Sequence, residues 1–271
     1  MSDVVSEKFA PRTVGPATRR QMFELMAKVY DAIDEATFVS DLEEKDFVIL
    51  TTCDDAVVGF TTGIVRSSLV QGRPVRHVFS GDTVISPEHW GPGHFFPLWF
   101  NLMGRIKAAE PEIPLYWFLV ARGHRTYRFM TGFFRTYIPK PEAKQDAFLA
   151  AVRDTLSHEK FGSYYDPATG LIDFGESKGH LVPELQDATE VAEGNRRVRD
   201  FMSLNPDYGR GVELACVAEL SETVRERGAL RFVEAGPAFG KPAVDDGGIE
   251  IADHAVGLLP SASKFVAQID H

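Results

Sequence analysis

The sequence predicts an α/β fold, and three observations support this prediction. Some segments repeat apolar residues at helical spacing, others are short, apolar and β-branched, and the two kinds alternate along the first half of the chain. With 271 residues, of which 44% are hydrophobic and 25% charged, the chain can bury a sizeable core. This length fits one large domain or two small ones.

Three helices are expected in the first half of the chain, over residues 18–31, 94–109 and 124–138. The first repeats apolar residues at i, i+3, i+4 and i+7, with Thr18 as its expected N-cap. Pro97 fits the second helix because proline is tolerated in a first helical turn. The third is expected to end at Pro139.

Four strands are expected between these helices, over residues 47–53, 56–65, 75–86 and 115–121. The pair Asp54-Asp55 separates the first two strands and predicts a hairpin. A turn from Gln71 to Pro74 leads to the third strand. The fourth, LYWFLVA, has no polar alternation, so we expect it to be buried on both faces.

The second half of the chain has fewer clear elements. Residues 145–161 are typical of an amphipathic helix, and GVELACVAEL, residues 211–220, is typical of a strand. Residues 163–180 are loop-like, and residues 188–205 are expected to be helical. Residues 228–235 form either another strand or a helix end.

Charge and composition exclude several functional classes. The formal net charge is −10, and nucleic-acid-binding surfaces need clustered Lys and Arg, so no nucleic-acid partner is expected. No run of about eighteen apolar residues predicts a membrane span, and no secretory signal opens the chain, so we expect a cytoplasmic protein. One local arginine cluster forms either a binding face or a solvated helix face: Arg122, Arg125, Arg128 and Arg135.

The segment EHWGPG, residues 88–93, lies between the third strand and the second helix. Glycines let the backbone approach a phosphate closely, and a helix N-terminus supplies N–H donors with a favourable dipole. A Gly-x-Gly pair alone is equally compatible with a simple structural turn.

Together with the order of elements, this loop resembles the GNAT superfamily of acyltransferases. Their pyrophosphate loop, Gln/Arg-x-x-Gly-x-Gly/Ala, follows the fourth strand, and EHWGPG matches it except at Glu88. TYRFMTGFF, residues 126–134, is similar to the family's segment on the helix after the fifth strand. AVVGFTTG, residues 56–63, is similar to its second and third strands. The resemblance covers residues 18–138, about half of the chain.

The resemblance implies a mixed, mainly antiparallel sheet flanked by helices, splayed near residues 82–86 and 115–121, with a C-terminal extension. Residues 1–140 are then the acyl-donor-binding core. Residues 141–271 are a helical insertion with late strands that complete the sheet or the acceptor side. The implied co-substrate is a thioester of acyl-CoA or acyl-carrier protein, the acceptor is a small amine, and no metal is expected.

Two residues depart from the family pattern. Glu88 places a negative side chain near the expected pyrophosphate, and Pro92 removes one N–H donor from the loop. Residues 140–210 have no counterpart in a minimal member of the family. Such departures occur in branches that use long acyl chains or acyl-carrier donors, so the donor stays open between acyl-CoA and acyl-carrier protein.

The resemblance also implies which residues bind the donor. Backbone N–H groups of the strand before the loop are expected to bind the thioester carbonyl, at Thr83, Val84 and Ile85. The pyrophosphate is expected on the loop, at His89, Trp90, Gly91, Gly93 and His94.

The same resemblance directs the search for an acid and a base. Asp82 is the candidate general base, with Ser80 on the same strand face by the two-residue period, and the alternative is a bulge whose aspartate caps a turn. Tyr127 is the candidate acid for the departing thiolate, and the alternative is a core tyrosine with a satisfied hydroxyl. Tyr137 and His124 are further candidates.

These residues favour an acyltransferase that moves an acyl group from a thioester to the amine of a small molecule. One alternative is an acyl-homoserine-lactone-type or N-acyl amino acid synthase. This alternative would explain the aromatic excess of the chain. The aromatic run 95–100 is compatible both with an acyl-chain channel beside the loop and with a core stripe. The other alternative is a non-catalytic acyl-CoA-binding or sensor module, favoured by Glu88 and Pro92.

Overall fold

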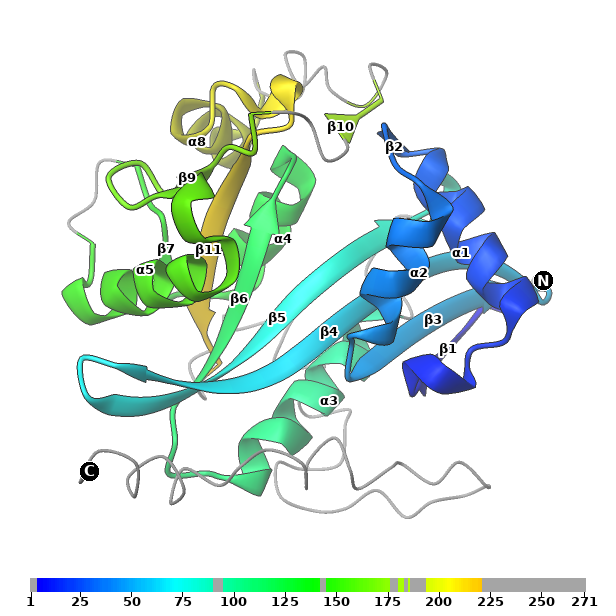
Figure 1. Ribbon diagram of the computed structural model, residues 1–271, viewed down its shortest axis with the longest axis horizontal. Helices are drawn as coiled ribbons and strands as arrows, with labels where there is room; N and C mark the ends of the chain where they lie inside the picture. The colour runs from blue at the N-terminus through cyan, green and yellow to red at the C-terminus, as the bar shows by residue number, and fades with distance from the viewer. Residues whose placement is uncertain are drawn as a thin grey trace.

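The computed structural model describes residues 4–89, 95–141, 145–175, 180–182, 185 and 194–220. The strands are β1 Val4–Phe9, β2 Tyr30–Asp31, β3 Phe47–Cys53, β4 Ala56–Val70, β5 Arg73–Ile85, β6 Leu115–Ala121, β7 Tyr137–Ile138, β8 Tyr165–Asp166, β9 Leu171–Ile172, β10 His180–Leu181 and β11 Glu213–Glu219. The large sheet has the order β1-β3-β4-β5-β6-β11-β9-β8, with β7 beside β11, and β10 pairs separately with β2 (Figure 1). Strands from both halves of the chain therefore share one sheet.

Only one junction of this sheet is parallel. β5 and β6 run in the same direction, whereas every other described pair of neighbouring strands is antiparallel. The predicted mixed, mainly antiparallel sheet flanked by helices is confirmed.

Helices cover both faces of the sheet. Their bounds are α1 Pro16–Ala27, α2 Glu35–Glu43, α3 Phe95–Ala109, α4 His124–Phe133, α5 Ala147–Phe161 and α8 Arg196–Leu204. In Figure 1, α1, α2 and α5 lie in front of the sheet, and α3 and α4 lie behind it. β6 is buried on both faces as expected, because Tyr116 and Phe118 pack with α5 while Trp117 and Leu119 pack with α3 and α4. Among the described helices, none has both the length and the apolar character needed to cross a membrane.

Both predicted hairpin turns are confirmed. Asp54 and Asp55 have φ angles of 49° and 65°, and Gln71 and Gly72 have φ angles of 50° and 75°. Two consecutive residues in the left-handed region give a turn whose twist matches that of the flanking strands. Asp, Gln and Gly at these positions therefore fix the β3-β4-β5 meander locally.

Two helix boundaries differ from the prediction. α1 begins at Pro16 with Gly15 as N-cap, because the fixed φ of proline suits the first helical position. Thr18 therefore lies inside the helix rather than at its cap. α4 ends at Phe133, and Tyr137–Ile138 pair with β11 as β7, so tertiary pairing overrides the helical pattern there.

The predicted helix over 145–161 and strand over 211–220 are both confirmed. α5 begins where the Asp146 carboxylate accepts a hydrogen bond from the Leu149 N–H at 2.8 Å. α8 forms within the segment 188–205, and residues 186–193 and 228–235 lie outside the described residues.

The loop-like segment 163–180 contains the short hairpin β8-β9. Its turn is closed by the Asp166 carboxylate, which accepts hydrogen bonds from the Ala168 N–H at 2.9 Å and the Thr169 hydroxyl at 2.7 Å. Side-chain bonds of this kind favour turns over longer elements. β9 pairs with β11, and this pairing holds the hairpin to the sheet.

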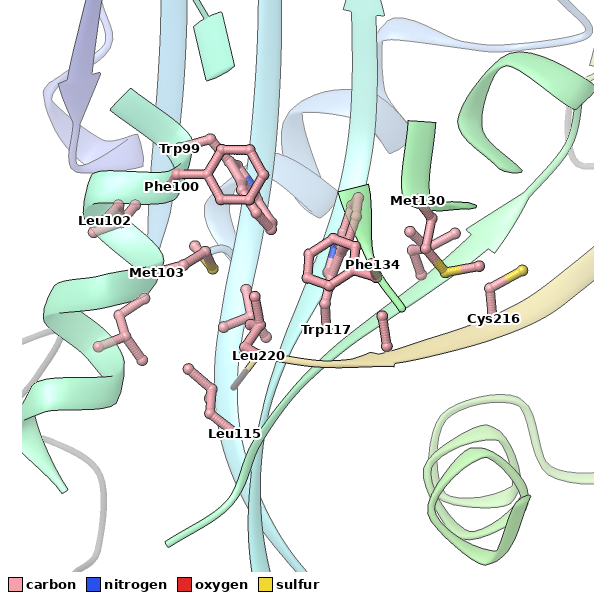
Figure 2. Close-up of a cluster of buried hydrophobic side chains, with 14 of the residues drawn as sticks. Trp99, Phe100, Leu102, Met103, Leu115, Trp117, Met130, Phe134, Cys216 and Leu220 are labelled. Atoms are coloured by element: carbon pink, nitrogen blue, oxygen red, sulfur yellow. The ribbon is translucent and has the colours of Figure 1, made fainter. Parts of the chain in front are cut away.

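The largest core cluster lies between the sheet and the helices α3 and α4 (Figure 2). The Trp117 ring centre is 4.6 Å from that of Trp99 and 5.5 Å from that of Phe134. Trp99 and Phe100 are 2% and 3% exposed, so these two residues of the aromatic run belong to the core. The side chains of Phe95 and Phe96 lie outside what the structure describes.

Replacing Trp117 with Ala is expected to lower the free energy of unfolding by about 3–5 kcal/mol, because it opens a cavity among three aromatic rings and removes a donor to Ser80. Urea unfolding followed by circular dichroism measures this change. The control is Val5→Thr on β1, where the side chain is 42% exposed and a change within about 0.5 kcal/mol is expected. Equal losses in the two variants would contradict the assignment of Trp117 to the core.

Candidate active site

β5 and β6 pair along only part of their length. The parallel register runs from Arg76 opposite Leu115 to Ser80 opposite Leu119. Beyond these residues, 81–85 of β5 pair with β4 alone, and the end of β6 pairs with β11. The two strands are therefore neighbours that separate after Ser80 and Leu119, and the predicted splay is confirmed.

A β-bulge in β5 marks the start of this separation. In the pairing of β4 with β5, the two residues Gly81 and Asp82 oppose the single residue Thr62. The extra residue bends the strand and increases its twist. A β carbon at Gly81 would lie 2.5 Å from Thr62 Oγ1 and 2.8 Å from Lys45 Cε, so these two side chains would have to shift to admit any other residue at this position.

Asp82, the second residue of the bulge, carries a half-buried carboxylate. Burial, followed by the negative charge of Asp41, raises its pKa above the usual range, while Arg122 and Lys45 act in the opposite direction. Within the described part of the chain, this carboxylate accepts no hydrogen bond. A carboxylate with a raised pKa and no bound donor is suited to take up a proton.

Ser80 does not share a face with Asp82, and that prediction is wrong. The Ser80 hydroxyl accepts a hydrogen bond from Trp117 Nε1 at 2.7 Å, among the core residues under α3 and α4. Asp82 instead lies near α2, through Asp41. The bulge adds one residue to the strand and so breaks the two-residue alternation on which the prediction depended.

Arg122 is the second charged group beside Asp82. It follows β6 directly, and its Nε donates a hydrogen bond to Glu213, the first residue of β11. The Arg122 guanidinium carbon lies 5.4 Å from the centre of the Tyr30 ring. The side chains of Arg122 and Glu213 are 23% and 3% exposed. Burial alone lowers the pKa of Arg122, but the charges of Glu213, Tyr30 and Asp82 and the hydrogen bond to Glu213 together outweigh it, so the pKa is raised and the guanidinium stays ionised.

The sequence did not reveal the pairing of Arg122 with Glu213. Arg122 was grouped with arginines of the following helix, but α4 begins only at His124. The pair joins residues 91 positions apart, and no local pattern predicts such a contact. The available signal is a charged residue beside each of two apolar runs, with Arg122 directly after residues 115–121 and Glu213 directly before residues 214–218.

The strand pair β2-β10 lies at the end of the sheet where β5 and β6 separate (Figure 1). Tyr30 of β2 pairs with Leu181 of β10. A β carbon at Gly123 would lie 2.8 Å from Leu181, so β10 packs directly on the start of α4. Three segments far apart in the sequence thus meet around Arg122.

Tyr127 is fully buried in α4. Its hydroxyl donates a hydrogen bond to the Pro139 carbonyl at 3.0 Å. Burial, followed by the neighbouring Tyr137, raises the pKa of Tyr127 above its usual value, so the hydroxyl stays protonated. The role of Tyr127 as acid stays a prediction, and it requires the hydroxyl to leave Pro139.

The two further candidates also lie on or beside α4. The Tyr137 ring is half-buried, 6.4 Å from that of Tyr127, and Lys140 Nζ lies 4.4 Å from its centre. Burial, followed by the charges of Arg125 and Arg128, lowers the pKa of His124 to about 4. His124 is therefore neutral near pH 7 and cannot donate a proton as an imidazolium there.

The predicted donor-binding residues divide into two groups. Thr83, Val84 and Ile85 lie on β5 beyond its pairing with β6, and His89 ends a short 3₁₀ turn over Pro87–His89. The remaining predicted residues lie outside the described residues: Trp90, Gly91, Gly93 and His94. The described ends of this loop are the end of β5 and the N-terminus of α3.

The direction of the β5 backbone selects among the three strand residues. The Ser86 N–H donates to the Val58 carbonyl at 2.8 Å, across β4. Backbone N–H groups point alternately to the two sides of a strand. The N–H of Val84 therefore also points to β4, whereas the N–H groups of Thr83 and Ile85 point to the side from which β6 has separated. The Thr83 side chain is exposed, with its Oγ1 2.6 Å from Thr61 Oγ1.

No protein-family model matches the sequence, and no curated protein matches it. Solved structures do match. One is a GCN5-related N-acetyltransferase from Kribbella flavida, with 13% identity, a TM-score of 0.38 and coverage of 83% of this chain and 68% of that one. Another is a GNAT family N-acetyltransferase from Escherichia coli in complex with CoA, with 18% identity, a TM-score of 0.31 and coverage of 49% and 68%.

Both of these solved structures are described as N-acetyltransferases. A further match is a protein from Enterococcus faecalis V583 described as a probable N-acyltransferase, with 14% identity and a TM-score of 0.37. That match covers 50% of this chain but only 33% of the Enterococcus chain. In the described part of the chain, no group of three His, Cys, Asp or Glu side chains is arranged to hold a metal ion.

Replacing Gly81 with Ala is expected to lower the free energy of unfolding by about 1–3 kcal/mol, because Thr62 and Lys45 must shift to admit a methyl group. The matched control is Gly132→Ala in α4, where a β carbon has nothing within 4 Å. Since alanine favours a helix interior, the control is expected to stabilise the protein by about 0.5–1 kcal/mol. Thermal and urea unfolding measure both changes, and effects of the same sign would contradict the account of the bulge.

Proposed function

We propose that the protein is an acyltransferase of the GNAT type that moves an acyl group from an acyl-thioester to the amine of a small molecule. The observation that supports this most directly is the carboxylate of Asp82 on the bulge where β5 separates from β6. A base there lies beside a strand edge that pairs with no described strand. Such an edge can bind an extended ligand through backbone hydrogen bonds.

In this proposal the donor arm lies along β5, where residues 81–85 have left β6. The N–H of Thr83 points to this side and would donate to the thioester oxygen, where negative charge develops during acyl transfer. The donor phosphates would bind before α3, because a helix N-terminus favours anions. The residues proposed for this are His89, Trp90, Gly91, Gly93 and His94.

The chemistry assigned to Asp82 is proton transfer. The amine nitrogen attacks the thioester carbon, a C–N bond forms, and the C–S bond breaks. Of the two protons that an ammonium group loses in becoming an amide, one goes to Asp82 and the other leaves on the thiol. A raised pKa brings Asp82 closer to the pKa of the amine, which makes the transfer less unfavourable. Tyr127 is proposed to relay this second proton: once its hydroxyl has left Pro139, it donates its own proton to the departing thiolate and takes up the second proton from the nitrogen.

The two parts of the chain have different roles in this proposal. Residues 1–140 supply the donor side through β5 and α3. Residues 141–271 contribute to the acceptor side through β11, whose Glu213 holds Arg122 beside Asp82. The proposed donor is a thioester of acyl-CoA or of acyl-carrier protein. The identity of the acceptor amine would distinguish a simple acetyltransferase from an N-acyl amino acid synthase, because the synthase acylates an amino acid.

The non-catalytic alternative depends on Glu88. This exposed side chain accepts a hydrogen bond from the Ser86 hydroxyl, which lowers its pKa and keeps it ionised near the proposed phosphate site. A sensor module would be stabilised thermally by acyl-CoA and would acylate none of a broad panel of amines. An acyltransferase would release free thiol in the same panel.

Replacing Asp82 with Asn is expected to lower kcat by about 10²–10⁴-fold, because an amide cannot accept the proton. In the parent, kcat is expected to rise with pH and then level off, since only the ionised carboxylate acts as base. In the variant, this rising limb of the pH profile is expected to be absent. Asp41→Asn is the matched control, because losing that negative charge lowers the pKa of Asp82 and moves the limb to lower pH. Thiol release from acyl-CoA across a pH series measures these effects, and an unchanged limb in Asp82→Asn would exclude Asp82 as the base.

Replacing Gly93 with Val is expected to weaken CoA binding by about 2–4 kcal/mol, the value of one or two hydrogen bonds to a charged group, because the side chain keeps the phosphate from the backbone. Glu88→Gln is expected to bind CoA equally or more tightly, since it removes a like charge. Calorimetric titration with CoA and acyl-CoAs measures both, with Gly132→Ala as control. Parent-like affinity in a folded Gly93→Val variant would mean that the loop is only a turn.

A further inference from the structure

Arg122 has hydrogen-bond donors that the described part of the chain does not use. Its Nε donates to Glu213, and its side chain makes no other hydrogen bond to a described residue. The two outer nitrogens, Nη1 and Nη2, are not among the buried polar atoms without a partner, so they remain accessible. The charge of the guanidinium acts on Asp82, so the two groups lie near each other.

Other largely buried arginines of the chain differ from Arg122 in this respect. Arg76 Nη1 donates to the Ile106 carbonyl at 2.9 Å, and Arg153 Nη2 donates to the Pro167 carbonyl at 3.1 Å. Their outer nitrogens therefore hold neighbouring backbone segments in place. Arg122 is held at its inner nitrogen instead, which leaves its outer edge for a ligand.

The orientation of this guanidinium is fixed before any ligand arrives. Glu213, 3% exposed, accepts the bond from Nε, and the Tyr30 ring lies 5.4 Å from the guanidinium carbon. A planar guanidinium with two parallel N–H donors matches the two oxygens of a carboxylate. Because the side chain is already ordered, little conformational entropy is lost on binding.

The surrounding charges restrict which carboxylate can bind. Four charged residues act on Asp82, and they form two ion pairs: Arg122 with Glu213, and Lys45 with Asp41 at 2.5 Å. The positive and negative charges of these pairs cancel, so the negative charge of Asp82 has no counter-charge among them. A simple anion at Arg122 would be repelled by Glu213 and Asp82. A simple ammonium group would balance Asp82 but leave the outer edge of Arg122 unused. A zwitterion satisfies both sites.

We infer that the acceptor is an amino acid or a similar zwitterion, with its carboxylate on the outer nitrogens of Arg122 and its amine beside Asp82. This inference rests on the proposed acyl transfer for the reaction and adds the chemical class of the acceptor. Asp82 takes one proton from the ammonium group, and the neutral nitrogen then attacks the thioester. The N-acylated product has lost its positive charge, so Asp82 no longer attracts it, and this favours its release.

The test compares acceptors that differ only at the carboxylate. Glycine, L-lysine and L-phenylalanine are each tested beside the corresponding amide and decarboxylated amine, with acetyl-CoA and a long-chain acyl-CoA as donors. The parent is expected to prefer at least one amino acid over its amide by at least about tenfold in kcat/KM, because the amide cannot accept both hydrogen bonds with a charge. Equal use of acids and amides would overturn the inference and leave the proposed acyl transfer intact.

The variant for this test is the double substitution Arg122→Gln with Glu213→Gln, which leaves no buried carboxylate without its partner. Its ratio of kcat/KM for acid over amide is expected to fall close to one. Arg66→Gln is the matched control, since Arg66 also lies on the sheet and pairs with a carboxylate, Asp46, at 2.7 Å, and its ratio is expected to stay at the parent value. A preference that persists in the double variant would overturn the inference.

A binding measurement separates this inference from the proposed function. Calorimetric titration of the parent and the double variant with the same amino acids and amides requires no turnover. If no amine is acylated but the parent binds amino acids selectively through Arg122, the proposed reaction fails and the binding site stands. If the parent binds acids and amides alike, the inference fails whatever the outcome of the turnover assay.

Discussion

The close packing of Gly81 against Thr62 and Lys45 determines the centre of the sheet. It allows two residues of β5 to oppose one residue of β4, and β5 leaves β6 directly after this point. The same bulge carries Asp82 toward α2 and leaves Ser80 in the core. The bulge therefore lies where the strand edge begins, and it sets the direction of the carboxylate on that edge.

The ion pair between Arg122 and Glu213 connects this edge to the second half of the chain. Removing one partner of a buried pair typically costs about 3–5 kcal/mol, because the other charge is left uncompensated. A well-packed apolar pair would often stabilise a fold equally well. Our proposal that Arg122 binds a ligand through its outer nitrogens gives these charges a role other than stability.

Much of the fold could be predicted because its signals are local. The two-residue turns and the capped helix α5 are specified by neighbouring residues, and the structure contains them. The two-residue strands β7, β8 and β9 were missed, because only their tertiary partners define them. At the site, Asp82 was proposed from its strand position, but the bulge that separates it from Ser80 depends on contacts with Lys45 and Thr62. The partner of Arg122 is too distant in sequence to be predicted from either residue alone.

The pairing of β6 with β11 has a consequence for how the chain folds. β6 is wholly apolar, and its neighbour on one side is contributed by residues 213–219, about a hundred positions later. During synthesis, β6 therefore emerges well before the strand that covers its edge. Such long-range pairing is slow to form, and an uncovered apolar edge promotes association between chains. The middle of this sheet is thus completed late, and the partially folded chain is most prone to aggregate while β11 is missing.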